Sequence, residues 1–408
     1  MVEMKNQKPK IINVQCVSCD AKYDIEPFRY QCDCGENLDI IYDYASISQK
    51  WTKQDLAKNP DRSHWRYLPI LPVKNAPKRT MQIGGTPLIP FAKIAEEFGV
   101  SEFFVKDDTR NPSGSLKDRA TDIGIQHATE MGENTIVAAS TGNAAASLSA
   151  LSAFYGKNAI ILAPASAPKA KLTQILQYGA TLFPVNGTYD DAFALSMKIS
   201  EKYGFYSRST GINPILSEGK KTVGLEIAEQ LNWNVPDLIF VPTGDGCIIG
   251  GVYKSFWDLK KLGWIDKMPK LVAVQSEGSC ASVNALKNDG KIEPVSSNTI
   301  ADSISVDNPA DGTKALRAVK NSDGFGITVS DDEILTAQKE LSEKTGIFTE
   351  PAAASSFAGF KKATESRKIE KNETVVILAT GTGLKDIPAA QKKIEIPEAI
   401  DSIENLNL

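Results

Sequence analysis

The segment 110–121 constrains this chain more than any other. It follows an apolar run at 103–105 that is typical of a strand, and it begins as a turn rich in Asn, Pro, Ser and Gly. Beyond Lys117 the apolar residues recur at helical spacing. Lys117 is therefore predicted to lie where a loop enters a helix, near orphan backbone N–H groups and a positive dipole end. That environment lowers the pKa of an amine and favours a nucleophile that forms Schiff bases, although a surface lysine beside an ordinary turn also fits.

The composition is that of an ordinary globular protein and excludes several classes of partner. The 408 residues are 42% apolar and 24% charged, which suits two or three domains. A net charge of −4 gives no electrostatic case for nucleic acid or for an anionic membrane. Residues 1–8 lack the apolar core of a signal peptide, and no apolar run approaches the roughly 20 residues that span a bilayer. We therefore expect a cytoplasmic protein with no membrane or nucleic-acid partner.

Four of the six cysteines are gathered near the N-terminus in two close pairs. The pairs are Cys16-Val-Ser-Cys19 and Cys32-Asp-Cys34, and the second is tighter than the usual Cys-x-x-Cys. Thiols of a chain without an export signal stay reduced, so disulfides are not expected. The spacing fits a structural Zn²⁺ site with four thiolate ligands, and a reduced hairpin without metal is the alternative. We predict a zinc-ribbon-like module over residues 1–45.

From residue 100 onward, short continuous apolar runs alternate with stretches at helical spacing. The runs lie at 134–139, 159–162, 181–183, 237–241, 271–274 and 374–378, and the helical stretches at 144–154, 189–202 and 222–230. Such runs are typical of strands that are buried on both faces of a parallel sheet. The alternation predicts an α/β fold with mostly parallel sheets, whose ligands bind beyond the carboxyl ends of the strands.

Three of these runs end in a polar or glycine-rich turn. The turns are Ser140-Thr-Gly-Asn143, Gly244-Asp-Gly-Cys-Ile248 and Thr380-Gly-Thr-Gly-Leu-Lys-Asp386. The first two open helices, where backbone N–H groups and the helix dipole can bind an anion. Taken alone, each turn also fits an ordinary helix cap or the end of a strand.

Together these motifs resemble one enzyme family. Ser113-Gly-Ser-Leu-Lys117-Asp-Arg119 is similar to the cofactor-lysine motif of the fold type II, tryptophan-synthase-β-like pyridoxal-phosphate enzymes, and Gly85-Thr-Pro-Leu88 to their start motif. The three turns follow in the family's order, and the last resembles a motif of the threonine synthases. The resemblance covers about residues 80–390. We expect residues 46–80 to form an arm that wraps the main body. Two interleaved α/β domains should follow, a large one at 81–124 and 211–395 and a small mobile one at 125–210.

The resemblance also implies a role for each motif. Lys117 would hold pyridoxal phosphate covalently and, once an amino acid substrate has freed it, remove the substrate's α-proton. Asn143 would hydrogen-bond the phenolic oxygen of the cofactor, and Thr380 its pyridine nitrogen. The cofactor phosphate would lie in a cup made by Gly244, Asp245, Gly246, Cys247 and Ile248. The substrate carboxylate would bind at Ser140, Thr141 and Gly142.

The implied reaction converts O-phospho-L-homoserine and water to L-threonine and phosphate in a homodimer. Two residues depart from the threonine-synthase pattern. Leu216 stands where an arginine usually holds the substrate phosphate, and Ile248 where an asparagine often contacts it. The cations that could compensate are Lys169, Lys171, Lys220 and Arg208.

Two other functions are therefore considered. One is a related lyase or β-replacement enzyme, such as a serine/threonine dehydratase or a cysteate-synthase-like protein. The other is a non-catalytic zinc-ribbon protein on a degenerate scaffold, against which the intact Lys117 and the four matching motifs argue.

Overall fold

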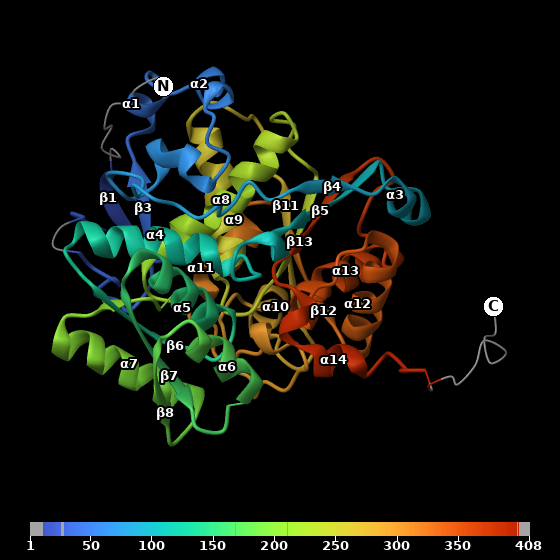
Figure 1. The fold of residues 1–408 in the computed structure, drawn as a ribbon. Coiled ribbons are helices and arrows are strands. Elements are labelled where there is room, and N and C mark those ends of the chain that lie inside the picture. Colours follow the sequence, from blue (N-terminus) through green and yellow to red (C-terminus); the bar gives the residue numbers. More distant parts are fainter. Residues whose placement is uncertain (1–10, 26–27, 168, 210, 398, 400–408) are drawn as a thin grey trace.

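The computed structural model describes residues 11–25, 28–167, 169–209, 211–397 and 399. Within these residues the chain forms three sheets, and the two larger ones are surrounded by helices (Figure 1). No helix in these ranges is both long enough and apolar enough to cross a membrane. The prediction about residues 1–8 lies outside the described part of the chain. The predicted α/β architecture with mostly parallel sheets is confirmed.

The largest sheet carries the ends of most predicted site segments. Its described strands are β4 (Leu88–Pro90), β5 (Glu102–Asp107), β10 (Leu238–Pro242), β11 (Lys270–Ser276), β12 (Phe325–Val329) and β13 (Thr374–Ala379). They lie in the order β12-β11-β10-β13-β5-β4, and only β4 runs antiparallel to its neighbour. Residues 239 and 241 of β10 pack into one core cluster, and residues 238 and 240 into another. Both faces are thus buried, which explains the continuous apolar runs.

Helices cover both faces of this sheet (Figure 1). On one face lies α13 (Pro351–Glu365), which is packed against α12 (Asp331–Thr345). On the other face lie α9 (Cys247–Lys261) and α11 (Gly312–Lys320), and α8 (Pro214–Gln230) packs between α9 and α4 (Lys117–Glu130). Shorter helices are α3 (Ala92–Phe98), α10 (Ala281–Lys287) and α14 (Ile387–Gln391).

A second parallel sheet forms the lower lobe in Figure 1. Its strands are β6 (Thr135–Ala139), β7 (Asn158–Pro164), β8 (Thr181–Val185) and β9 (Tyr206–Ser207), in the order β8-β7-β6-β9. The accompanying helices are α5 (Asn143–Tyr155), α6 (Lys169–Gln177) and α7 (Tyr189–Tyr203). The proposed limit between residues 124 and 125 falls inside α4, which packs against α5 of this lobe.

The N-terminal segment is an antiparallel sheet followed by short helices. The strands are β1 (Ile11–Cys16), β2 (Lys22–Tyr23) and β3 (Leu38–Tyr42), and the helices are α1 (Tyr44–Ser48), α2 (Lys53–Lys58) and η1 (His64–Ile70). Trp51 and Trp65 are buried in the same core cluster as α8 and α9, and the rings of Trp51 and Trp264 are 4.5 Å apart. The segment 46–80 therefore shares the core of the main body.

Two elements differ from the sequence-based expectation. Helix α8 begins at Pro214 instead of residue 222, because Asn213 caps it and the proline occupies its first turn. Strand β12 was not expected, since Gly326 and Thr328 interrupt its apolar residues. In the sheet β12 pairs with β11, so its position is fixed by a distant partner.

Candidate active site

The loop before Lys117 is fixed to the end of β13. The backbone N–H of Leu116 donates to the carbonyl of Thr380 at 2.9 Å, and that of Thr382 donates to the carbonyl of Gly114 at 3.0 Å. Ser113 is held in turn by the carboxylate of Asp118, which accepts its backbone N–H at 2.7 Å. Two motifs that lie more than 260 positions apart in the sequence are therefore one structural unit.

Lys117 is the first residue of α4, as the sequence predicts. Its side chain is partly buried, and its amine has no hydrogen bond or ion pair among the described residues. Removal from water lowers the pKa of this amine, nearby Arg208 lowers it further, and the carboxylate of Glu350 opposes the change. An unpaired amine with a lowered pKa is a competent nucleophile and proton acceptor.

A buried ionic network holds α4 in place two residues beyond Lys117. Arg119 donates to Asp108 Oδ2 at 2.7 Å and to Glu226 Oε1 at 2.6 Å, and it is fully buried. Lys106 on β5 donates to Glu226 Oε2 at 2.7 Å, and Thr86 donates to Asp108 at 2.6 Å. Strand β5, its following turn and helices α4 and α8 therefore meet in one set of charge-assisted hydrogen bonds.

Asn143 is the first residue of α5 and is held by a residue that sequence reasoning missed. Its amide donates to the two oxygens of Glu350 at 2.8 and 3.0 Å. Glu350 precedes α13, and its backbone N–H donates to the carbonyl of Gly381 at 3.0 Å. Burial raises the pKa of Glu350, while Asn143 and Lys117 counteract that rise. Glu350 thus orients Asn143 beside Lys117.

The turn 244–248 opens α9 in the way that an anion site requires. Gly246 has a φ of 95°, and a Cβ there would lie 2.5 Å from the carbonyl oxygen of Asp311, so only glycine fits. The side chain of Asp245 accepts the backbone N–H of Ala310 at 3.2 Å, which ties its carboxylate to the segment before α11. No side chain caps the start of α9 at Cys247. The start of α9 therefore has the form of an anion-binding helix N-terminus.

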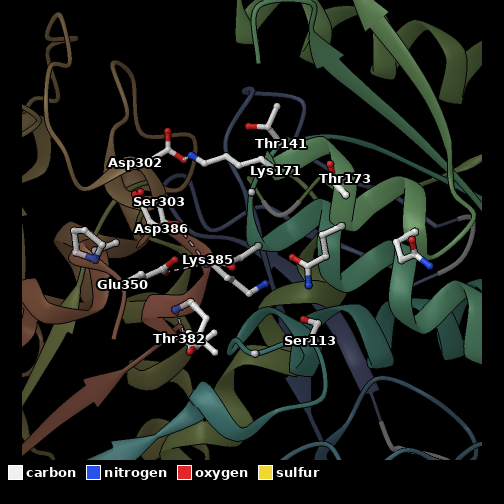
Figure 2. Close-up of a pocket in the computed structure, with 18 of the residues that line it drawn as sticks. Ser113, Thr141, Lys171, Thr173, Asp302, Ser303, Glu350, Thr382, Lys385 and Asp386 are labelled. Atoms are coloured by element: carbon white, nitrogen blue, oxygen red, sulfur yellow. Dashed lines mark hydrogen bonds and ion pairs between the residues drawn. The ribbon is translucent and has the colours of Figure 1, made fainter. Parts of the chain in front are cut away.

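A cavity of about 630 Å³ lies beside these motifs. Figure 2 shows Thr141 and Lys171 on one side of it, and Glu350, Thr382 and Lys385 on another. Thr141, Gly142 and Asn143 line this cavity, whereas Ser140 does not; its hydroxyl accepts the backbone N–H of Gly142 at 3.2 Å. Turn 244–248 and Thr380 are likewise absent from the cavity wall.

The cations that the sequence offers for a phosphate are divided between two places. Lys171 lines the cavity and is paired with Asp302 at 2.7 Å, and Lys169 is exposed. Arg208 and Lys220 are buried, and both lie within electrostatic reach of Lys117. Leu216 is fully buried, and a Cβ added at Gly124 of α4 would lie 2.6 Å from one of its methyl groups.

Lys385 is a further cavity residue to which sequence reasoning gave no role, although it lies in the motif that begins at Thr380. Its amine is buried and has no hydrogen-bond partner among the described residues. Burial lowers its pKa, and Glu350 and Asp118 oppose that change. A buried amine of this kind beside a cavity is suited to bind an anionic group of a ligand.

The four N-terminal cysteines form a compact cluster. Their sulfur atoms all lie within 4.8 Å of one another, and two pairs, Cys16 with Cys34 and Cys19 with Cys32, are 3.6 Å apart. Ligands of a tetrahedral zinc site, with Zn–S bonds of about 2.3 Å, lie about 3.8 Å apart. The cluster therefore has the dimensions of a site that could hold a metal ion.

Comparisons with known proteins match this geometry. A model of the family described as "Pyridoxal-phosphate dependent enzyme" matches residues 79–381. The chain is 40% identical over 396 residues to the threonine synthase of Methanocaldococcus jannaschii, covering 96% of this chain and 97% of that protein. It is 39% identical to the threonine synthase of Methanosarcina acetivorans, with 96% of each chain covered. The chain belongs to the pyridoxal-phosphate-dependent enzymes, in the threonine synthase family.

Solved structures share the fold at lower identity. The processed form of threonine deaminase isoform 2 from Solanum lycopersicum matches with a TM-score of 0.66 at 24% identity, over 75% of this chain and 81% of that one. Maize serine racemase matches with a TM-score of 0.65 at 24% identity, over 75% of this chain and 90% of that one. These likenesses support the fold type II architecture.

The residues at the site fit pyridoxal phosphate. Lys117 offers an unpaired amine, and the start of α9 offers uncapped N–H groups for a phosphate. The hydroxyl of Ser115 and the amine of Lys385 are buried without partners in the described part of the chain, as expected of groups that await a ligand. Thr380 follows β13 next to the Lys117 loop, and its hydroxyl has no hydrogen-bond partner among the described residues.

Proposed function

We propose that this chain converts O-phospho-L-homoserine and water to L-threonine and phosphate. The proposal is supported by the place of the Lys117 amine, which is unpaired among the described residues. It lies near Glu350, which binds Asn143, near the segment of Thr380 and near the start of α9. The threonine synthase relatives cover nearly the whole chain and supply the reaction class. A hydroxyl partner such as Thr380 does not hold the cofactor ring protonated, which favours controlled elimination and replacement.

In this reaction the chain's own residues bind the reactants and move protons. Lys117 would hold the cofactor through its amine, and the same amine, once free, would accept the α-proton of the substrate. Pyridoxal phosphate supplies the electron sink that stabilises the resulting carbanion. Glu350 keeps Asn143 oriented, and Asn143 would hold the phenolic oxygen of the cofactor.

The substrate carboxylate binds, in this proposal, between residues 141–143 and Lys385. We expect Lys385→Met to raise the KM for O-phospho-L-homoserine about 10- to 100-fold, because a charge-assisted hydrogen bond is worth about 1.5–3 kcal/mol. The absorbance of the bound cofactor should be the same in this variant as in the wild type. Lys393→Met is the matched control, since Lys393 pairs with Asp332 near the surface. An unchanged KM in Lys385→Met would remove Lys385 from the substrate site.

A steady-state comparison of substrates tests the proposed function. Purified holoenzyme should show its highest kcat/KM with O-phospho-L-homoserine and release threonine and phosphate in equal amounts. Serine, threonine and O-phosphoserine should be poor substrates. Ammonia and a keto acid as the main products, from any of these compounds, would favour the dehydratase alternative. Preferred turnover of O-phosphoserine would favour a cysteate-synthase-like replacement enzyme.

The cysteine cluster is proposed to bind one structural Zn²⁺ ion. Four thiolates leave no open position for catalysis, and a structural ion contributes directly to folding. We expect about one zinc per chain by elemental analysis, and Cys19→Ser should lose it and make the N-terminal module sensitive to proteolysis. Cys280→Ser is the control, because Cys280 lies outside the cluster. A protein that contains no zinc, or a Cys19→Ser variant that keeps it, would contradict this assignment.

Cellular location and oligomeric state are the last two parts of the proposal. We propose that the chain works in the cytoplasm and that it forms a homodimer, on the resemblance to biosynthetic enzymes described above. Sedimentation of the holoenzyme over a range of concentrations would test the dimer, and a monomer at all concentrations would refute it.

A further inference from the structure

Lys220 is a buried cation that the proposed reaction does not yet use. It lies on α8, where α8 packs against the start of α9; a Cβ added at Gly251 would be 3.1 Å from the Cβ of Lys220. The residue is 1% exposed. Its amine forms no hydrogen bond or ion pair with any residue that the structure describes. A buried ammonium without a counter-ion is costly, so a function for it is expected.

The next residue in the helix shows what a structural lysine looks like in this environment. Lys221 is equally buried, but its amine donates to Asp258 at 2.6 Å and also to Glu218. Lys254 of α9 joins the same carboxylates. These cations are neutralised by carboxylates of the protein, whereas Lys220, one position earlier on α8, lies within electrostatic reach of Lys117.

The surroundings of Lys220 place it at the start of α9. Burial lowers its pKa to about 8, the charges of Lys117 and Arg208 lower it as well, and Cys247 and Asp311 act in the opposite direction. Cys247 is the first residue of α9 and follows Gly246. The ammonium of Lys220 therefore lies within electrostatic reach of both Lys117 and the uncapped helix start.

Arg208 brings a second cation to the same place from the other lobe. It follows β9, is 3% exposed, and donates to the hydroxyl of Thr121 at 3.0 Å and to the carbonyl of Lys117 at 3.4 Å. Burial lowers its pKa to about 10, while Asp118 and Cys247 oppose that change. Its guanidinium therefore places a second positive charge next to Lys117.

We propose that Lys220 and Arg208, together with the start of α9, bind a phosphate group next to Lys117. Two cations and a helix N-terminus match a dianion, and each contributes a charge-assisted hydrogen bond. Such a site also explains how the chain functions with Leu216 and Ile248 at positions that lack a phosphate ligand. The phosphate belongs either to the cofactor or to the substrate, and the two sources are separable by experiment. Only binding of the substrate phosphate rests on the proposed function.

The cofactor arm compares two ligands that differ only in the phosphate. Apoprotein of the wild type and of Lys220→Gln is titrated with pyridoxal phosphate and with pyridoxal, and binding is followed by absorbance. If Lys220 binds the cofactor phosphate, the variant loses about 10- to 100-fold in affinity for pyridoxal phosphate and nothing for pyridoxal. Lys260→Gln, at the exposed far end of α9, should bind both ligands as the wild type does.

The substrate arm uses holoenzyme and the spectral change that an amino acid produces. If Lys220 binds the substrate phosphate, Lys220→Gln loses about 10- to 100-fold in affinity for O-phospho-L-homoserine but keeps its affinity for L-homoserine. If O-phospho-L-homoserine causes no spectral change in the wild-type holoenzyme, the proposed function is contradicted. The cofactor titrations would then still test whether Lys220 binds a phosphate.

Arg208→Gln should show the same selectivity in whichever arm responds to Lys220→Gln. Lys220→Met serves as a second uncharged variant if the glutamine variant does not fold. Equal losses for the phosphorylated and unphosphorylated ligands would assign Lys220 a purely structural role. Either that result or unchanged affinities in both arms would overturn the proposal.

Discussion

Replacing Lys117 by alanine should abolish turnover and remove the visible absorbance of the covalently held cofactor. Lys117 is the unpaired amine at the start of α4, and no histidine of the chain adjoins it: His64 pairs with Asp122, and His127 contacts Tyr206. The expected loss in kcat is at least about 10³-fold, because proton transfer by a positioned side chain contributes about 10²–10⁴-fold and the covalent attachment is lost too.

The control for this variant is Lys117→Arg, which keeps a positive charge but cannot bind the cofactor covalently. Both variants should keep the far-ultraviolet circular dichroism of the wild type, because the amine of Lys117 makes no structural contact among the described residues. Pyridoxal phosphate that remains covalently attached in Lys117→Ala would show that another lysine carries it. Retained turnover would contradict the assignment of Lys117 as the proton acceptor.

Replacing Arg119 by methionine should produce the largest loss of stability. The change leaves the buried carboxylates of Asp108 and Glu226 short of their main partner, and Lys106 can neutralise only one of them. Breaking a buried ion pair from one side costs about 3–5 kcal/mol. Urea unfolding followed by tryptophan fluorescence should therefore show a midpoint shifted to much lower urea.

Arg110→Met is the matched control for this prediction. Arg110 also donates to an aspartate, Asp107, at 2.7 Å, but its side chain is 61% exposed. Its loss should cost less than about 1 kcal/mol, since exposed ion pairs contribute little. Equal midpoints for the two variants would mean that the Arg119 network does not stabilise the fold.

Much of the architecture could be predicted because the relevant signals are local. Lys117 follows a turn and begins a helix, and the strands at 135–139, 238–242 and 374–379 are continuous apolar runs that end in recognisable turns. Strand β12 was not predicted, because its sequence lacks such a run and its place depends on pairing with β11.

The parts of the site that could not be predicted depend on contacts between distant residues. Glu350 meets Asn143 across 207 positions, and a glutamate before a proline gives no local sign of that contact. The different environments of Leu216 and Lys220 on α8 likewise follow from its packing against α4 and α9, which a single sequence does not reveal.

The measurement that tests the account most directly is the turnover of O-phospho-L-homoserine in water labelled with ¹⁸O, followed by mass spectrometry of the products. If phosphate is eliminated and water is then added, the threonine should carry one ¹⁸O in its hydroxyl group and the phosphate should carry no label. Threonine and phosphate should form in equal amounts. Homoserine with labelled phosphate would show cleavage of the phosphorus–oxygen bond. That result, or a keto acid with ammonia, would contradict the proposed function.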